Sequence, residues 1–123
     1  MYDLDPDGDF GFNKYQQKAH ETAEYPNIYV GGHPSNYIYA AMGLAGESGE
    51  LIEKLKKVVR NKNGLVAESD LFDIKKEVGD VLWYLSELCT CLNLSLKQIA
   101  RENIKKLSDR KNRGVIKSEG DNR

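Results

Sequence analysis

The chain lacks several features that mark large classes of protein. Its 123 residues contain no apolar run near the roughly 18 residues that a membrane span needs, and the acidic N-terminus has no signal-peptide pattern. A formal net charge of −1 gives no overall positive field for nucleic acid. The two cysteines, Cys89 and Cys91, are two positions apart on a predicted helix and point in different directions, so they cannot readily form a disulfide. We expect a soluble, cytoplasmic protein with reduced thiols that binds neither membrane nor nucleic acid.

The N-terminal residues 1–11 are rich in aspartate. Asp3-x-Asp5-x-Asp7-Gly8 imitates the start of a calcium-binding loop, but Lys14 stands at position twelve, where such a loop requires a carboxylate. We therefore interpret residues 1–11 as a flexible acidic tail, 12–113 as one helical domain and 114–123 as a polar C-terminal tail.

Apolar periodicity and end signals predict an all-α domain. Helices are expected at about residues 13–25, 36–61, 69–92 and 95–113, with a loop between the first two. Pro26 should end the first helix and Asn63-Gly64 the second. The predicted capping residues are Asn13, Ser35, Ser69 or Asp70, and Ser95.

One pattern occurs twice. Residues 47–55 and 77–85 both read E-x-G-[ED]-[LV]-[IL]-x-x-L. Residues three apart project from one face of a helix, so each copy presents two carboxylates beside an apolar stripe. The acids are Glu47 and Glu50 in the first acidic motif, and Glu77 and Asp80 in the second.

If the two apolar stripes pack together, the four acids converge. Each like-charge pair at about 5 Å costs roughly 3 kcal/mol, so protons or cations must neutralise the group. An oxygen-only set selects hard ions such as Mg²⁺ or Mn²⁺. Ordinary solvated acids are the alternative in a chain that is 30% charged, but the repetition argues against it. Gly49 and Gly79 lie between the acids, where we expect a facing helix or a ligand to approach the backbone closely.

A basic stripe follows on the last predicted helix. Alone, such a stripe is a solvated surface, whereas opposite a metal site it would neutralise a triphosphate tail. Lys54, one turn after Glu50, could likewise contact a phosphate oxygen or simply pair with Glu50. The stripe consists of Asn103, Lys106, Arg110 and Arg113, at spacings of three, four and three.

Further residues extend the pattern on both sides of the acids: Gly43-Leu44-Ala45-Gly46 precedes them and Asn103-x-x-Lys106-Leu107-x-x-Arg110 follows. Together with the acids they resemble the MazG-like, all-α nucleoside triphosphate pyrophosphohydrolases over roughly residues 12–113. The resemblance implies a bundle of four to five helices completed by oligomerisation, and we expect a homodimer or homotetramer. It also implies hydrolysis of a (deoxy)nucleoside triphosphate at the α–β anhydride to a monophosphate and pyrophosphate.

The resemblance suggests roles for particular residues. Mg²⁺, or Mn²⁺ in its place, held by Glu47, Glu50, Glu77 and Asp80 would polarise phosphoryl oxygens and activate a water. Glu50 is the candidate general base because it projects further from the apolar stripe than Glu47 does. Tyr84, one turn past Asp80, either stacks on the nucleoside, as the resemblance implies, or packs in the core.

Two other classes of protein also use features of this pattern. A di-iron carboxylate bundle needs Glu-x-x-His pairs, and neither His20 nor His33 has a glutamate three residues before it. A non-catalytic helical oligomerisation or interaction module explains the apolar stripes but not the paired acidic motifs.

Overall fold

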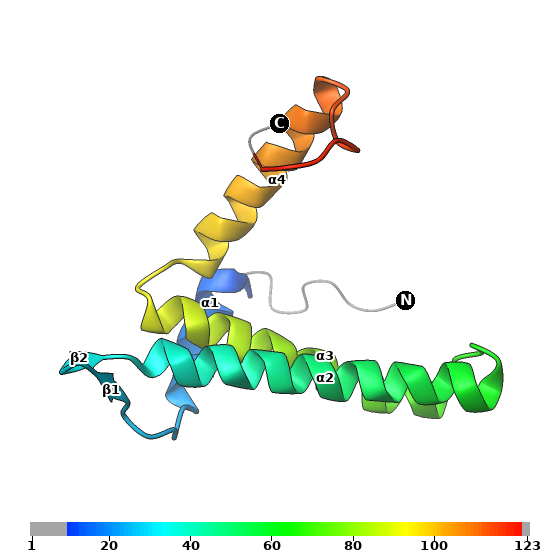
Figure 1. Ribbon diagram of the computed structural model, residues 1–123, viewed down its shortest axis with the longest axis horizontal. Helices are drawn as coiled ribbons and strands as arrows, with labels where there is room; N and C mark the ends of the chain where they lie inside the picture. Colours follow the sequence, from blue (N-terminus) through cyan, green and yellow to red (C-terminus); the bar gives the residue numbers. More distant parts are fainter. Residues whose placement is uncertain (1–9, 122–123) are drawn as a thin grey trace.

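The computed structural model describes residues 10–121, so residues 1–9 of the predicted acidic tail and residues 122–123 of the predicted C-terminal tail lie outside the described residues. The predicted all-α class is confirmed, and a short hairpin stands within the region predicted as a loop (Figure 1). The elements are α1 (Phe12–Glu21), β1 (Tyr29–Val30), β2 (His33–Pro34), α2 (Asn36–Lys62), α3 (Glu68–Cys91) and α4 (Leu96–Asn112).

Helices α2 and α3 form the long axis of the molecule, lying side by side (Figure 1). The predicted stop at Asn63-Gly64 is confirmed: both residues have positive φ, 52° and 79°, which turns the chain back after α2. The side chain of Asp70 accepts a hydrogen bond from the Ala67 N–H (2.9 Å). Helix α3 consequently starts at Glu68, slightly before the predicted cap at Ser69 or Asp70.

The start of α2 differs from its prediction in detail. The Ser35 hydroxyl donates to the His33 carbonyl oxygen (2.9 Å) and does not cap the helix. The preceding hairpin pairs Val30 with His33 across Gly31-Gly32, whose φ angles are 58° and 80°. Two successive positive φ angles are what a tight two-residue hairpin turn requires, so the glycine pair explains the hairpin.

Helix α1 ends at Glu21, earlier than the predicted end at Tyr25. Tyr25 instead leaves the helix to reach α3, where its hydroxyl donates to Glu87 Oε2 (2.7 Å). The same carboxylate oxygen lies 3.2 Å from His20 Nδ1, and the Glu87 side chain is fully buried. A buried carboxylate on α3 therefore ties down both α1 and the segment that follows it.

Gln16 joins α1 to the α3–α4 connection. Its side-chain amide donates to the Leu94 carbonyl oxygen (2.9 Å) and the Thr90 hydroxyl (3.2 Å), while its oxygen accepts from the Leu96 N–H (2.9 Å). Helix α4 begins as predicted, with the Ser95 hydroxyl accepting from the Gln98 N–H (3.1 Å).

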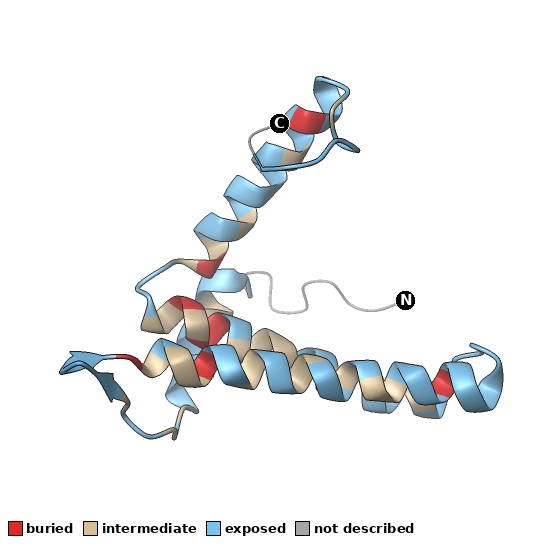
Figure 2. Cartoon of the chain, viewed as in Figure 1, coloured by how far each residue is buried: buried red, intermediate tan, exposed pale blue. Residues whose placement is uncertain are grey.

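Few residues are fully buried (Figure 2). Within the described residues, each helix buries only one or two apolar side chains. Ala40, at 0% exposure, is the most enclosed of them. By contrast, one face of α3 carries apolar side chains seven residues apart that are 37–54% exposed. This spacing is that of a helix-packing seam, so the described chain leaves an apolar face uncovered. The residues of this α3 seam are Leu71, Val78 and Leu85, together with Leu92, which directly follows the last residue of α3.

Helix α4 packs on α1 and points away from the α2–α3 pair (Figure 1). The C-terminal segment, predicted to be a polar tail, returns along it. There the Arg110 guanidinium donates to the Asp121 carbonyl oxygen (2.7 Å) and lies 3.3 Å from the Asp121 carboxylate. Arg110 is only 3% exposed as a result.

Candidate functional site

Three of the four predicted acids meet between α2 and α3. Glu47 comes from α2, and Glu77 and Asp80 come from α3 one turn apart. One carboxylate oxygen from each lies within 4.8 Å of the others. Glu47 and Glu77 are half-buried while Asp80 is exposed, so the group stands at the rim of the helix pair and opens to solvent.

The acids repel one another. Partial burial, followed by the charges of Asp80 and Glu77, raises the pKa of Glu47 above its ordinary value. Within residues 10–121, the cation that pairs with this group is Lys54, whose Nζ lies 3.6 Å from Glu77 Oε1 across the helix interface. Lys54 was predicted either to meet phosphate or to pair with Glu50. Its ion pair is with Glu77 of the second acidic motif rather than with Glu50, and its contact with phosphate remains a prediction.

Glu50 is exposed and does not belong to the group of three. Its charge still contributes to the raised pKa of Glu47, so it lies near the group. A carboxylate beside the ligand atoms, but not among them, is free to take a proton. The predicted role of Glu50 as base is compatible with this position, and its predicted role as a ligand remains a prediction.

The donor set fits a hard divalent cation. Every atom is a carboxylate oxygen, which is the donor that Mg²⁺ and Mn²⁺ prefer. Besides partial burial, the neighbouring charges of Asp80 and Glu77 raise the pKa of Glu47, and a cation would offset the effect of these charges. The chemistry of the three acids therefore suits a divalent ion, and either such an ion or a proton would relieve their repulsion.

Tyr84 borders the acids on the side away from the Asn63-Gly64 turn. Its ring lies directly on Gly43 of α2, where an added Cβ would come within 3.0 Å of three ring atoms. Partial burial, followed by the nearby Tyr39 and Glu47 side chains, raises the Tyr84 pKa. Trp83 packs edge-on against the Tyr84 ring, with centroids 5.0 Å apart. Tyr84 thus forms the aromatic end of the site.

The glycines of the acidic motifs face open space. A Cβ built on Gly49 or Gly79 would meet nothing within 4 Å among the described residues. The facing helix that the sequence suggested at these positions is therefore not provided by residues 10–121. A ligand, or a facing helix from outside the described residues, remains the prediction for what approaches there.

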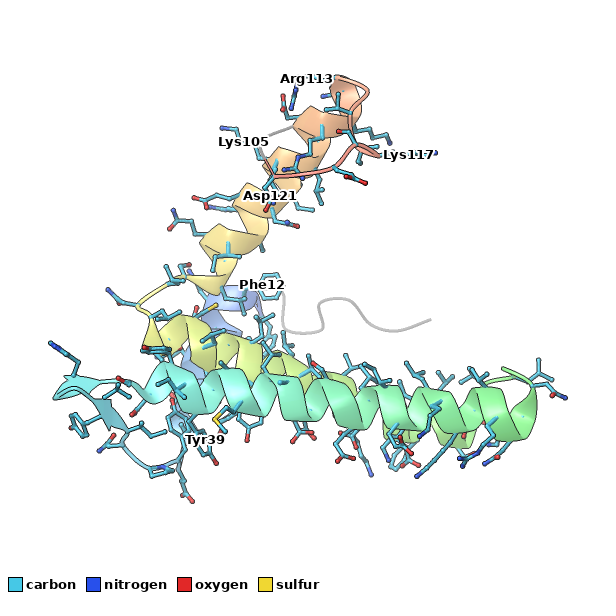
Figure 3. All side chains as sticks on the ribbon, viewed as in Figure 1. Phe12, Tyr39, Lys105, Arg113, Lys117 and Asp121 are labelled. Carbon is cyan, nitrogen blue, oxygen red and sulfur yellow. The ribbon has the colours of Figure 1, made fainter. Side chains whose placement is uncertain are left out.

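The basic stripe lies on α4, which points away from the α2–α3 pair that carries the acids (Figure 1). Lys106 Nζ is 3.6 Å from the Asp121 carboxylate, which also contacts Arg110, and Arg113 pairs with Asp109 at 2.8 Å. Figure 3 shows Asp121 lying along α4, with Arg113 at the helix end. Asn103 is exposed and shares a shallow hollow of about 290 Å³ with Lys106. Within one chain, these residues and the acids occupy separate regions.

Sequence reasoning missed a cavity of about 260 Å³ in the α2–α3 groove, on the other side of the acids from Tyr84. Lys54 belongs to both the cavity and the acidic group. The sequence did contain a signal for this cavity, because helical spacing puts residues 47, 50, 54, 57 and 61 in one row on α2. We call this cavity the lysine groove; it is lined by Lys54, Lys57, Val58, Asn61, Lys62, Asp70, Asp73 and Ile74.

Comparison with known proteins identifies the family. The model of the MazG nucleotide pyrophosphohydrolase domain matches residues 38–115, which include both acidic motifs and the whole of α4. The Gene 37 protein of Mycobacterium phage L5 is 40% identical over 109 residues, covering 89% of this chain and 96% of that protein. No solved structure matches the chain. Within residues 10–121, no helix has the length and apolar character needed to cross a membrane. The chain belongs to the MazG nucleotide pyrophosphohydrolase family.

Proposed function

We propose that the protein hydrolyses (deoxy)nucleoside triphosphates at the α–β anhydride, giving a nucleoside monophosphate and pyrophosphate. The observation that carries the proposal is the meeting of Glu47, Glu77 and Asp80 within 4.8 Å in a MazG domain. MazG proteins typically depend on Mg²⁺, and this oxygen-only group suits that ion.

Glu47, Glu77 and Asp80 would hold Mg²⁺, and the bound ion would neutralise charge on the phosphoryl oxygens and lower the pKa of a water. Mn²⁺, another hard ion, substitutes for it. Glu50 accepts a proton from the attacking water. The water oxygen bonds to the α-phosphorus as the bond from that phosphorus to the α–β bridging oxygen breaks. The bridging oxygen leaves with the electron pair as part of pyrophosphate, so no protein nucleophile is needed.

Tyr84 is proposed to lie against the nucleoside. Its ring stands beside Glu47, where a base attached to a phosphate held by the acids can reach it. An aromatic ring can stack on any base, so Tyr84 would contribute affinity for the nucleoside without base specificity.

The active assembly is proposed to be a homodimer or homotetramer. Two observations support this: the uncovered α3 seam and the open backbone at Gly49 and Gly79. A second copy packed on α2 and α3 would cover the seam, and an α4 from that copy could bring Asn103 and Lys106 toward the acids. The same assembly without catalysis is the competing reading, an oligomerisation module.

Pyrophosphate release from a panel of ribo- and deoxyribonucleoside triphosphates decides between the two readings. We expect release with Mg²⁺ or Mn²⁺, equimolar monophosphate, and no release after chelation with EDTA. Full activity in EDTA, or no activity on any nucleotide, would contradict the proposal.

The Glu50→Gln variant tests whether Glu50 acts as the general base or as a metal ligand. We expect hydrolysis to fall by about 10²- to 10⁴-fold, the range for loss of a general base. The rise in Tm on adding Mg²⁺ should persist, because Glu50 lies outside the group of three. Glu53→Gln, on the same helix and paired with Lys56 at 2.7 Å, is the matched control and should keep normal activity. If Glu50→Gln abolishes the Mg²⁺ shift, Glu50 is a ligand and another group is the base.

A further inference from the structure

The lysine groove is continuous with the acidic group. The row 47, 50, 54, 57, 61 on α2 faces a row with the same spacing on α3, namely 70, 73, 77, 80, 84. The contact between Lys54 Nζ and Glu77 Oε1 at 3.6 Å joins the two parts of the site. The acids, Tyr84 and the groove therefore lie along one side of the α2–α3 pair.

The two ends of this side differ in chemistry. Beyond the acids in one direction stands Tyr84, which packs with Trp83. In the other direction stand the lysines, with Val58 and Ile74 as the apolar floor of the cavity. An elongated ligand centred on the acids would thus have an aromatic end and a cationic end.

The charges in the groove leave one lysine available. Lys62 is neutralised by Asp70, with its Nζ 2.8 Å from both carboxylate oxygens. Lys54 is paired with Glu77. Lys57 is exposed and makes no ion pair with any carboxylate of the described residues. Helical side chains lean toward the N-terminus, so Lys57 extends back over the turn that carries Lys54 and toward the acids.

Resting on the proposed function, we propose that the lysine groove binds the β- and γ-phosphates of the nucleotide through Lys57 and Lys54. The substrate then lies along the α2–α3 pair, with its base at Tyr84, its α-phosphate at the acids and its phosphate tail toward the Asn63-Gly64 turn. The pyrophosphate formed on cleavage leaves from the groove.

Three features support this direction. Lys54 neutralises Glu77 in the described chain, and it becomes available to phosphate when that carboxylate is engaged with a divalent cation. The Asn61 side-chain amide adds a neutral donor to the lining. The basic residues Lys106 and Arg110 of α4 already contact Asp121 of the same chain, whereas Lys57 forms no ion pair with an acid within residues 10–121.

Substitutions at Asp73 and Lys57 should change the affinity for pyrophosphate in opposite directions, which makes the proposal testable. Asp73 lines the same groove and has no ion pair among the described residues, so its charge opposes a bound phosphate. Lys57→Gln should therefore weaken binding of magnesium pyrophosphate, and Asp73→Asn should strengthen it. Lys56→Gln is the matched control, since it removes the same charge from the neighbouring position outside the groove.

The test is calorimetric titration of the full chain and its variants with pyrophosphate and with a nucleoside monophosphate, both in saturating Mg²⁺. We expect about a tenfold weaker pyrophosphate Kd for Lys57→Gln, as loss of one charge-assisted contact gives. Asp73→Asn should tighten Kd by roughly twofold to fivefold. Monophosphate binding should change less than about twofold in either variant, because that ligand does not reach the groove.

The outcomes separate this inference from the proposed function. If the wild type cleaves nucleotides but Lys57→Gln binds pyrophosphate like Lys56→Gln, the groove is not the phosphate seat and the proposed function stands. If no nucleotide is cleaved but the opposed effects of Lys57→Gln and Asp73→Asn appear, the groove stands and the proposed function fails. Absence of any pyrophosphate binding by the wild type, or equal losses for monophosphate and pyrophosphate, overturns the groove.

Discussion

Gly43→Ala should be less stable than Gly46→Ala. Both glycines lie inside α2, one turn apart, so alanine gains about 1 kcal/mol of helix propensity at each position. At Gly46 the added Cβ meets nothing within 4 Å, and the gain should appear in full. At Gly43 the Cβ would fall within 3.0 Å of the Tyr84 ring, which must move.

Forcing a packed ring to move costs about 1–3 kcal/mol. Since the propensity gain is common to both variants, their difference isolates this cost. Gly43→Ala should therefore be less stable than Gly46→Ala by about 1–3 kcal/mol. For a chain of this size that corresponds to a Tm lower by roughly 4–12 °C.

Urea unfolding and thermal melting at matched protein concentration would measure the difference, because association links stability to concentration. A double-mutant cycle with Tyr84→Ala then assigns the cause: in that background the penalty at Gly43 should vanish. Equal stability of the two glycine variants, or a penalty that survives removal of Tyr84, would refute the contact. If Tyr84 also lies against the nucleoside, Gly43→Ala should raise KM as the ring shifts.

Two further predictions concern the acids and the α1 anchor. Asp80→Asn should stabilise the metal-free protein by about 1 kcal/mol after solvent screening, reduce the Mg²⁺-induced rise in Tm, and lower hydrolysis at least about tenfold. The folded chain holds the Glu47 proton more firmly than the unfolded chain, so wild-type stability without metal should fall as pH rises through the raised Glu47 pKa. Asp80→Asn should make this fall less steep. A lower melting temperature for metal-free Asp80→Asn than for the wild type would contradict the repulsion on which both expectations depend. Gln16→Ala should cost about 1–3 kcal/mol by removing three hydrogen bonds, whereas exposed Gln17→Ala should be nearly neutral in the same denaturation experiment.

Local chemistry made part of the fold predictable. The Asn63-Gly64 turn and the Ser95 cap depend on residues within four positions, and both were confirmed. The end of α1 depends on contacts far along the chain. Tyr25 stacks on Tyr39, with ring centroids 5.2 Å apart, and bonds Glu87, so these contacts override the helical periodicity that predicted a longer α1.

The site divides in the same way. Repetition and i, i+3 spacing were enough to single out Glu47, Glu77 and Asp80, which the fold brings together. Spacing alone could not say that Glu50 stands outside this group, because that depends on how α2 is rotated against α3. The pairing of Lys54 with Glu77 depends on the same rotation and on the register of the two helices, which a period of about 3.6 residues does not specify.

Glycine at positions 49 and 79 lowers helix stability but leaves the backbone accessible to a ligand or a second chain. Alanine at Gly49 and Gly79 would meet no neighbour among the described residues and would stabilise the two helices by about 1 kcal/mol each. A library selected for heat resistance alone should accumulate alanine at both positions. A library selected for pyrophosphate release should keep glycine wherever a ligand or a second chain uses the bare backbone. Sequencing the survivors of both selections would therefore reveal which glycine serves the reaction and which only weakens its helix.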